Sequence, residues 1–111
     1  MKGVDNMKTF SSYNSEEGIE KLMNCADDIF TIMTHKEVSK VLGTGNFLKI
    51  GGEAVKNCKE EVERILDELD EHPESVIGMT AGITQVIMEV MSDKDFKDFF
   101  TFLTSKKKEI Q

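Results

Sequence analysis

The chain has little of what builds a disulfide scaffold or a membrane segment. Its 111 residues include one proline, two cysteines, one tyrosine and no tryptophan, and its apolar runs are only a few residues long. Small secreted domains usually carry four or more cysteines, and a membrane-spanning helix needs about 20 apolar residues. The first ten residues also lack the apolar core of a secretory signal. We therefore expect a protein of the reducing cytosol, with no membrane contact, in which Cys25 and Cys58 are buried free thiols.

Basic residues are scarce relative to acidic ones. Lys and Arg number 14 against 21 Asp and Glu, so the net charge is −7. A surface that binds nucleic acid or anionic lipid must supply cations, and this composition argues against both partners. Hydrophobic residues make up 39%, which is enough for the core of one domain of this length.

Apolar residues recur at steps of three and four along most of the chain, whereas strand-like alternation is almost absent. The apolar stripes cover residues 19–33, 38–42, 55–69, 76–91 and 96–103. This periodicity predicts an all-α fold, a small bundle of four to five helices formed by residues 15–105. Residues 1–14 have no helical period and are expected to be a flexible arm, and residues 106–111 are expected to be a basic tail.

Capping signals predict where the helices begin and end. Three pairs have the spacing of a capping box: Asn14 with Glu17, Thr34 with Glu37, and Ser92 with Asp95. Pro73 suits the first turn of a helix over residues 73–91. Gly51 and Gly52 leave two alternatives for the start of the helix that ends before Pro73. Either this helix begins after them at Ala54, or the glycines admit a neighbouring backbone. Gly78 and Gly82 form either a close-contact groove or ordinary packing positions.

No arrangement of residues indicates a catalytic or metal site. His35 and His72 lie far apart and are expected at helix ends, and there is no Cys-x-x-Cys or His-Glu-x-x-His. Residues 43–46 lack the Gly-Lys-Ser/Thr end of a phosphate loop, so Gly43 and Gly45 predict a helix stop. The acidic neighbours of Cys25 raise a thiol pKa. We therefore expect a protein that is not an enzyme and holds no cofactor.

Most of the net charge lies in one segment. Between Glu53 and Glu74, nine acidic residues face three basic ones, a local balance of 3 − 9 = −6. The simplest interpretation is a solvated helix face with the pairs Lys59–Glu63 or Glu60–Arg64. The alternative is an acidic face that binds a basic protein or imitates a nucleic-acid backbone. That face would consist of Glu60, Glu63, Asp67, Asp70 and Glu71.

A second candidate surface is apolar. The chain has seven methionines, and the flexible methionine side chain suits surfaces that accept varied apolar partners. Met88 lies off the main stripe of its helix, and Phe102 is out of phase with Phe99. Either the last helix is wedged in the centre of the bundle, or it exposes an apolar patch. The residues expected to contact a client or a second copy of the chain are Met88, Met91, Phe99, Phe102 and Leu103.

The layout of residues 15–104 resembles the tail assembly chaperones of long-tailed bacteriophages and of prophages in Gram-positive bacteria. The segments that carry the resemblance are NCADDIF at 24–30, residues 42–57 with LKIGGEAVKN, and Phe96-x-x-Phe99-Phe100. The resemblance implies a small, acidic, mostly helical protein of the host cytoplasm. Such a protein coats the apolar tape measure protein until tail tube subunits assemble around it. Many members also have a longer form made by ribosomal frameshifting, and Lys106 to Lys108 fit either a slippery codon stretch or plain lysines.

The competing hypothesis is an acidic helical inhibitor, immunity protein or decoy that blocks a basic protein surface. The response to salt separates the two functions. A complex held by charge dissociates as salt rises, whereas an apolar complex persists or strengthens.

Overall fold

The computed structural model describes residues 7–95 and 98, and this part of the chain is helical with no strand. The elements are a short 3-10 helix η1 (Phe10–Ser12) and the helices α1 (Ser15–Thr34), α2 (Lys36–Leu42), α3 (Phe47–Asn57), α4 (Lys59–Glu68) and α5 (Val76–Ser92). The all-α fold predicted from the sequence is confirmed. In the described residues no helix combines the length and apolarity that crossing a bilayer requires.

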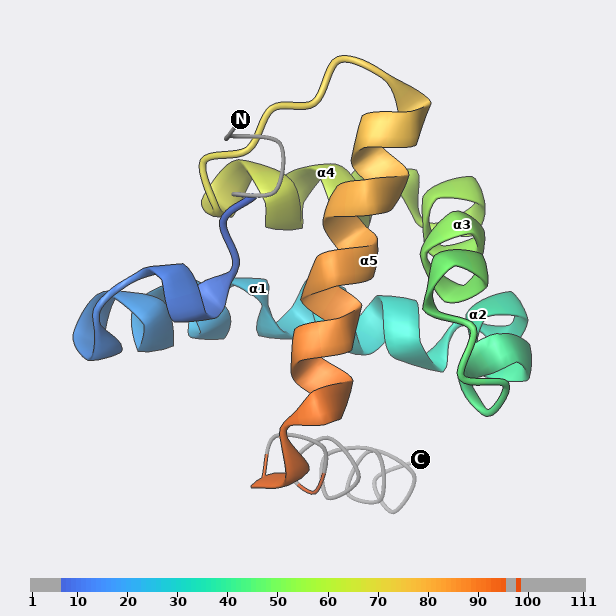
Figure 1. Ribbon diagram of the computed structural model, residues 1–111, viewed down its shortest axis with the longest axis horizontal. Helices are drawn as coiled ribbons and strands as arrows, with labels where there is room; N and C mark the ends of the chain where they lie inside the picture. Colours follow the sequence, from blue (N-terminus) through green and yellow to red (C-terminus); the bar gives the residue numbers. More distant parts are fainter. Residues whose placement is uncertain (1–6, 96–97, 99–111) are drawn as a thin grey trace.

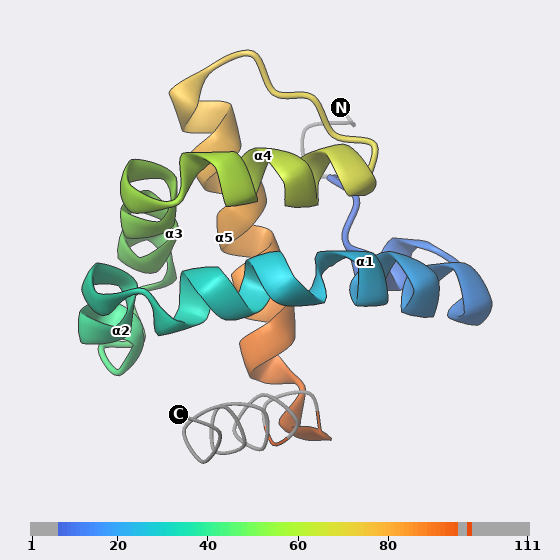
Figure 2. The same cartoon turned by 180° about the vertical axis from the view of Figure 1, so that it is seen from behind.

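Helices α1 and α4 lie side by side and run in opposite directions, and α5 crosses over both of them (Figures 1 and 2). Helix α3 runs antiparallel to α5, and α2 and α3 together close one end of the molecule (Figure 1). Helix α5 packs against α3 and α4, and its Ile83 and Ile87 lie beside Ile29 of α1 in the core. This arrangement makes α5 the central element of the bundle.

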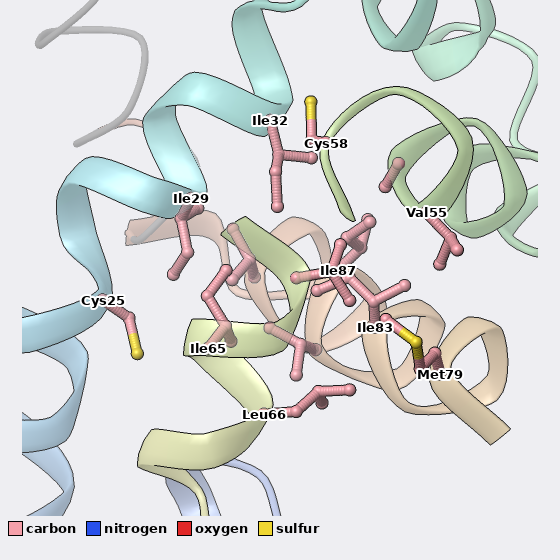
Figure 3. Close-up of a cluster of buried hydrophobic side chains, with 14 of the residues drawn as sticks. Cys25, Ile29, Ile32, Val55, Cys58, Ile65, Leu66, Met79, Ile83 and Ile87 are labelled. Carbon is pink, nitrogen blue, oxygen red and sulfur yellow. The ribbon is translucent and has the colours of Figure 1, made fainter. Parts of the chain in front are cut away.

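The core lies where α1, α4 and α5 cross, and Figure 3 shows its side chains converging from these helices and from the α3–α4 junction. Its fully buried large side chains include Ile32 of α1, Ile50 of α3, Ile65 and Leu66 of α4, and Ile83 of α5. Each such side chain contributes on the order of 1.5–3 kcal/mol when it leaves water. Helices α1, α3, α4 and α5 therefore all contribute large side chains to the core.

Local capping explains where α1 and α2 begin. The backbone amide of Glu17 donates to Oδ1 of Asn14 (2.9 Å), as predicted. The second start is displaced by one residue: the Glu37 amide donates to Nδ1 of His35 (3.1 Å). Thr34, the predicted cap, instead donates its hydroxyl to the Phe30 carbonyl one turn back. The prediction of Thr34 as cap was wrong because its side chain bonds within α1.

The helix predicted over residues 54–69 is in fact two helices. Helix α3 begins at Phe47, includes both glycines and ends at Asn57, and α4 starts at Lys59. The break falls at Cys58, whose φ of −134° and ψ of 47° are not helical. Cys58 is only 3% exposed. The bend buries this thiol and lets α3 follow α5 while α4 follows α1, which a straight helix could not do.

Helices α3 and α5 approach each other closely at Gly51. A Cβ atom on Gly51 would lie 2.0 Å from Oγ1 of Thr84 and 3.2 Å from the carbonyl oxygen of Thr80. The second of the two alternatives for the glycine pair is therefore confirmed at this position. Gly52 has open space around it and serves no such contact.

Helix α5 starts later than predicted. Its cap is Ser75, whose Oγ accepts from the amide of Gly78 (2.9 Å), so Pro73 lies in the preceding loop. Ser92 is the last residue of α5 and not the cap of a new helix. Lys94, Asp95 and Asp98 are helical, and the other residues of the predicted last helix lie outside the described residues.

The N-terminal segment requires a correction to the predicted arm. Residues 7–14 pack on the domain, and Phe10 is only 7% exposed and belongs to the core. The hydroxyl of Tyr13 donates to the Leu69 carbonyl (2.9 Å). The arm was placed too far along the chain because the groups that hold residues 7–14 are distant in sequence. Residues 1–6 and the predicted basic tail lie outside the described residues.

Candidate functional site

The predicted acidic face forms a concave surface. Four of its five residues line one shallow cavity of about 470 Å³ between α4 and the loop that leads to α5. These four are Glu60, Glu63, Asp67 and Glu71. Apolar side chains of Leu66, Pro73 and Met79 also line the cavity. The concavity, which we call the acidic cavity, therefore offers negative charge around an apolar floor.

Two of the predicted acidic residues already bind groups of the chain itself. The hydroxyl of Tyr13 donates to Oδ2 of Asp70 (2.9 Å), and this hydrogen bond lowers the pKa of the Asp70 carboxyl. Burial and the same carboxylate raise the pKa of Tyr13 to about 12. Oε2 of Glu71 accepts from the backbone amide of Lys8 (3.0 Å). Asp70 and Glu71 thus hold the N-terminal segment, which the sequence did not indicate.

Arg64 neutralises part of the charge at the rim of the acidic cavity. Its guanidinium pairs with Asp28 of α1 at 2.9 Å, and Glu61 lies 3.9 Å away. Asp28 raises the pKa of Arg64 through this hydrogen bond. Neither i, i+4 pair predicted for α4 forms within the described part of the chain. The predicted pairs were wrong because Arg64 reaches across to the neighbouring helix.

The apolar surface extends well beyond Met88. Six large apolar side chains are exposed in residues 7–95, from three helices. They are Ile19 and Met23 of α1, Leu48 of α3, and Val76, Ile77 and Met88 of α5. Ile19, Met23 and Val76 were expected to face inward. They are exposed because the first halves of α1 and α5 extend past their neighbours (Figures 1 and 2).

Leu48 and Met88 lie along the same contact between antiparallel helices. Gly51 meets Thr84 at this contact, and Leu48 is three residues before Gly51 while Met88 is four residues after Thr84. One helical turn covers 3.6 residues, so both side chains lie about one turn from the contact in the same direction. Leu48 is 66% exposed and Met88 42%. We call this pair the α3–α5 seam.

Of the other predicted apolar contacts, the structure describes Met91 alone. Met91 is partly buried and packs against the core, so the structure does not place it with the exposed residues of α5. Phe99, Phe102 and Leu103 lie outside the described residues. The sequence analysis did not select Leu48, which lies two residues before the buried Ile50 on α3.

Both thiols are buried, as predicted, and both are free. Burial, and then the charges of Glu68 and Asp28, raise the pKa of Cys25 to about 12. Burial also raises the pKa of Cys58. A thiol reacts as its thiolate, so neither cysteine is poised as a nucleophile. In the described residues, no three His, Cys, Asp or Glu side chains come together in a way that could hold a metal ion.

The two thiols give a direct test of this burial. At about pH 8 we expect the folded protein to react with a disulfide reagent at least about a hundredfold more slowly than the urea-unfolded chain. Two thiols should be titrated after unfolding. Rapid labelling of either cysteine in the folded protein would contradict the described packing of Cys25 and Cys58.

The comparisons with known proteins do not assign the chain to a family. No family model, curated protein or solved structure matches it. The function must therefore be argued from the two surfaces described above.

Proposed function

We propose that the chain is a non-enzymatic tail assembly chaperone of the phage or prophage type, which binds the tape measure protein and keeps it soluble during tail assembly. The α3–α5 seam carries the proposal. A client helix laid against Leu48 and Met88 would remove both side chains from water, which contributes on the order of 1.5–3 kcal/mol for each one fully buried. Methionine adapts its shape to different apolar partners.

Charge supports the same proposal. An apolar client must remain soluble while bound, and the net charge of −7 would give the complex like-charge repulsion against aggregation. The acidic residues of α4 lie on a helix separate from Leu48 and Met88. Such a chaperone would act in the host cytoplasm and bind the tape measure protein and tail tube subunits by protein contacts alone. It would form homo-oligomers through the same apolar residues when no client is present.

The test uses amphipathic helical peptides from a tape measure protein, the client that the proposal implies. Replacing Leu48 and Met88 by serine should weaken peptide binding by at least about tenfold, because two apolar contacts are lost. The control exchanges two exposed polar residues of the same helices, Lys56→Ser and Gln85→Ser. Unchanged binding by the Leu48/Met88 variant, with helicity retained, would contradict the proposal.

A second candidate function is an inhibitor or decoy that blocks a basic protein surface. The acidic cavity favours it, because a concave surface with three carboxylates from α4 and an apolar floor could receive a lysine or arginine side chain with its methylene stem. Replacing Glu60 and Glu63 by glutamine would abolish that binding and leave client binding at the α3–α5 seam unchanged.

A further inference from the structure

The N-terminal segment lies in a groove of its own domain in the manner of a bound peptide. Residues 7–12, which we call the strap, pass along α5 beside the end of α4 (Figures 1 and 2). At one end, Sδ of Met7 comes within 3.1 Å of where a Cβ on Gly82 would lie. Three residues on, Phe10 is buried in the core. The strap is therefore anchored by apolar side chains at its first and fourth positions.

Two carboxylates receive the polar groups of the strap. The amides of Phe10 and Ser11 donate to the two oxygens of Glu89 on α5, each at 3.1 Å. The hydroxyls of Thr9 and Ser11 also donate to Glu89. Closer to the N-terminus, the Lys8 amide donates to Glu71. Three of the four backbone amides from Lys8 to Ser11 are thus bound by the domain, as those of an extended ligand would be. The amide of Thr9 donates instead to Oγ of Ser12 within the strap (2.9 Å).

Glycines line the groove at two points where the strap passes, because a side chain there would collide with its neighbours. A Cβ on Gly18 of α1 would lie 2.8 Å from the carbonyl oxygen of Phe10. On the other side, Gly82 admits both Met7 and the methyl groups of Leu66. A cavity of about 250 Å³ remains beside Met7, lined also by Ala81 and Gln85. The groove therefore fits closely around the backbone of the strap at Phe10, whereas space remains unfilled beside the Met7 side chain.

We infer that this groove is a peptide-binding site whose ligand is the Met-x-x-Phe segment of residues 7–12, bound in cis and displaceable. Hydrogen bonds to a carboxylate are stronger than neutral ones, and the apolar anchors at positions one and four give selectivity. The same segment supplied on a separate peptide should bind the groove once the strap is weakened. Because the strap is tethered beside its site, its effective concentration is high and hides the site in the native chain. This inference does not depend on the proposed chaperone function.

The first experiment measures how often the strap opens. Trypsin cleavage after Lys8 in the full chain requires the strap to leave the groove. Replacing Glu89 by alanine, or Gly18 by alanine, should speed this cleavage by about tenfold, because four hydrogen bonds or the fit of the Phe10 carbonyl are lost. Glu20→Ala, which alters an exposed glutamate of α1, is the control. Equal cleavage rates in the native chain and both variants would overturn the inference.

The second experiment measures binding in trans. A fluorescein-labelled peptide of residues 7–14 is added to the full chain and to the Met7→Ser/Phe10→Ser variant, whose groove residues are intact. We expect the variant to bind the peptide at least about tenfold more tightly than the native chain does. Adding Glu89→Ala to the variant should abolish binding. Equal affinity for the native chain and the variant, or binding that does not need Glu89, would overturn the inference, and if the double variant fails to fold, the cleavage rates decide alone.

Discussion

Replacing Gly51 by alanine is expected to lower the free energy of unfolding by about 2–3 kcal/mol, the upper end of the cost of overpacking a core. The added Cβ would lie 2.0 Å from Oγ1 of Thr84, a distance that no two such atoms can keep. The Thr80 carbonyl at 3.2 Å limits escape in the other direction. Helices α3 and α5 would have to separate, and urea unfolding followed by circular dichroism measures the cost.

The neighbouring glycine provides a matched control. A Cβ on Gly52 would meet nothing within 4 Å, so Gly52→Ala should stabilise the protein by about 0.5–1 kcal/mol through helix propensity. Thr84→Ala should recover part of the loss in the Gly51→Ala background. The Thr84 hydroxyl is buried and has no hydrogen-bond partner among the described residues, so its removal leaves no group unsatisfied. Effects of the same sign at Gly51 and Gly52 would contradict the described contact.

The second large effect is expected at Leu66. This side chain is 1% exposed and lies between the acidic cavity and the strap. Leu66→Ala removes buried methyl groups and should cost about 2–5 kcal/mol in unfolding free energy. The matched control is Leu48→Ala on α3, where the leucine is 66% exposed and the expected cost is below about 0.5 kcal/mol.

The comparison of the two leucines also bears on function. If Leu48 contributes nothing to folding, its exposure on the α3–α5 seam is not explained by the stability of the isolated domain. A cost at Leu48 as large as that at Leu66 would show that it packs within the domain. It would then be unavailable to a client.

Much of the fold follows from local signals in the sequence. The start of α1 was predicted because the Asn14 side chain and the Glu17 amide that it caps are three residues apart. The burial of Ile65 and Ile83 was predicted because each lies at the centre of an apolar stripe. Such features depend on residues within one or two turns, which a single sequence displays directly.

The features that the sequence did not reveal depend on distant partners. Glu89 binds the strap although the two are about 80 residues apart in sequence. Arg64 pairs with Asp28 of α1 and not with the carboxylates that are closer to it in sequence. The break at Cys58 likewise comes from the packing of α3 and α4 on different helices. For the candidate surfaces, the composition of the acidic segment predicted an acidic face, and four of its five residues line one cavity. The exposure of Leu48 could not be predicted, because helical phase alone does not say where a neighbouring helix ends.

The central claim is that an apolar surface, and not the acidic cavity, binds the partner. The measurement that tests it most directly is the dissociation constant of the complex with a tape measure peptide between about 50 and 500 mM NaCl, a range over which exposed charge contacts are progressively screened. The account predicts an affinity that is unchanged or rises with salt, since apolar contacts do not weaken under these conditions. An affinity that falls by about tenfold or more would contradict it and would favour the acidic cavity as the binding site.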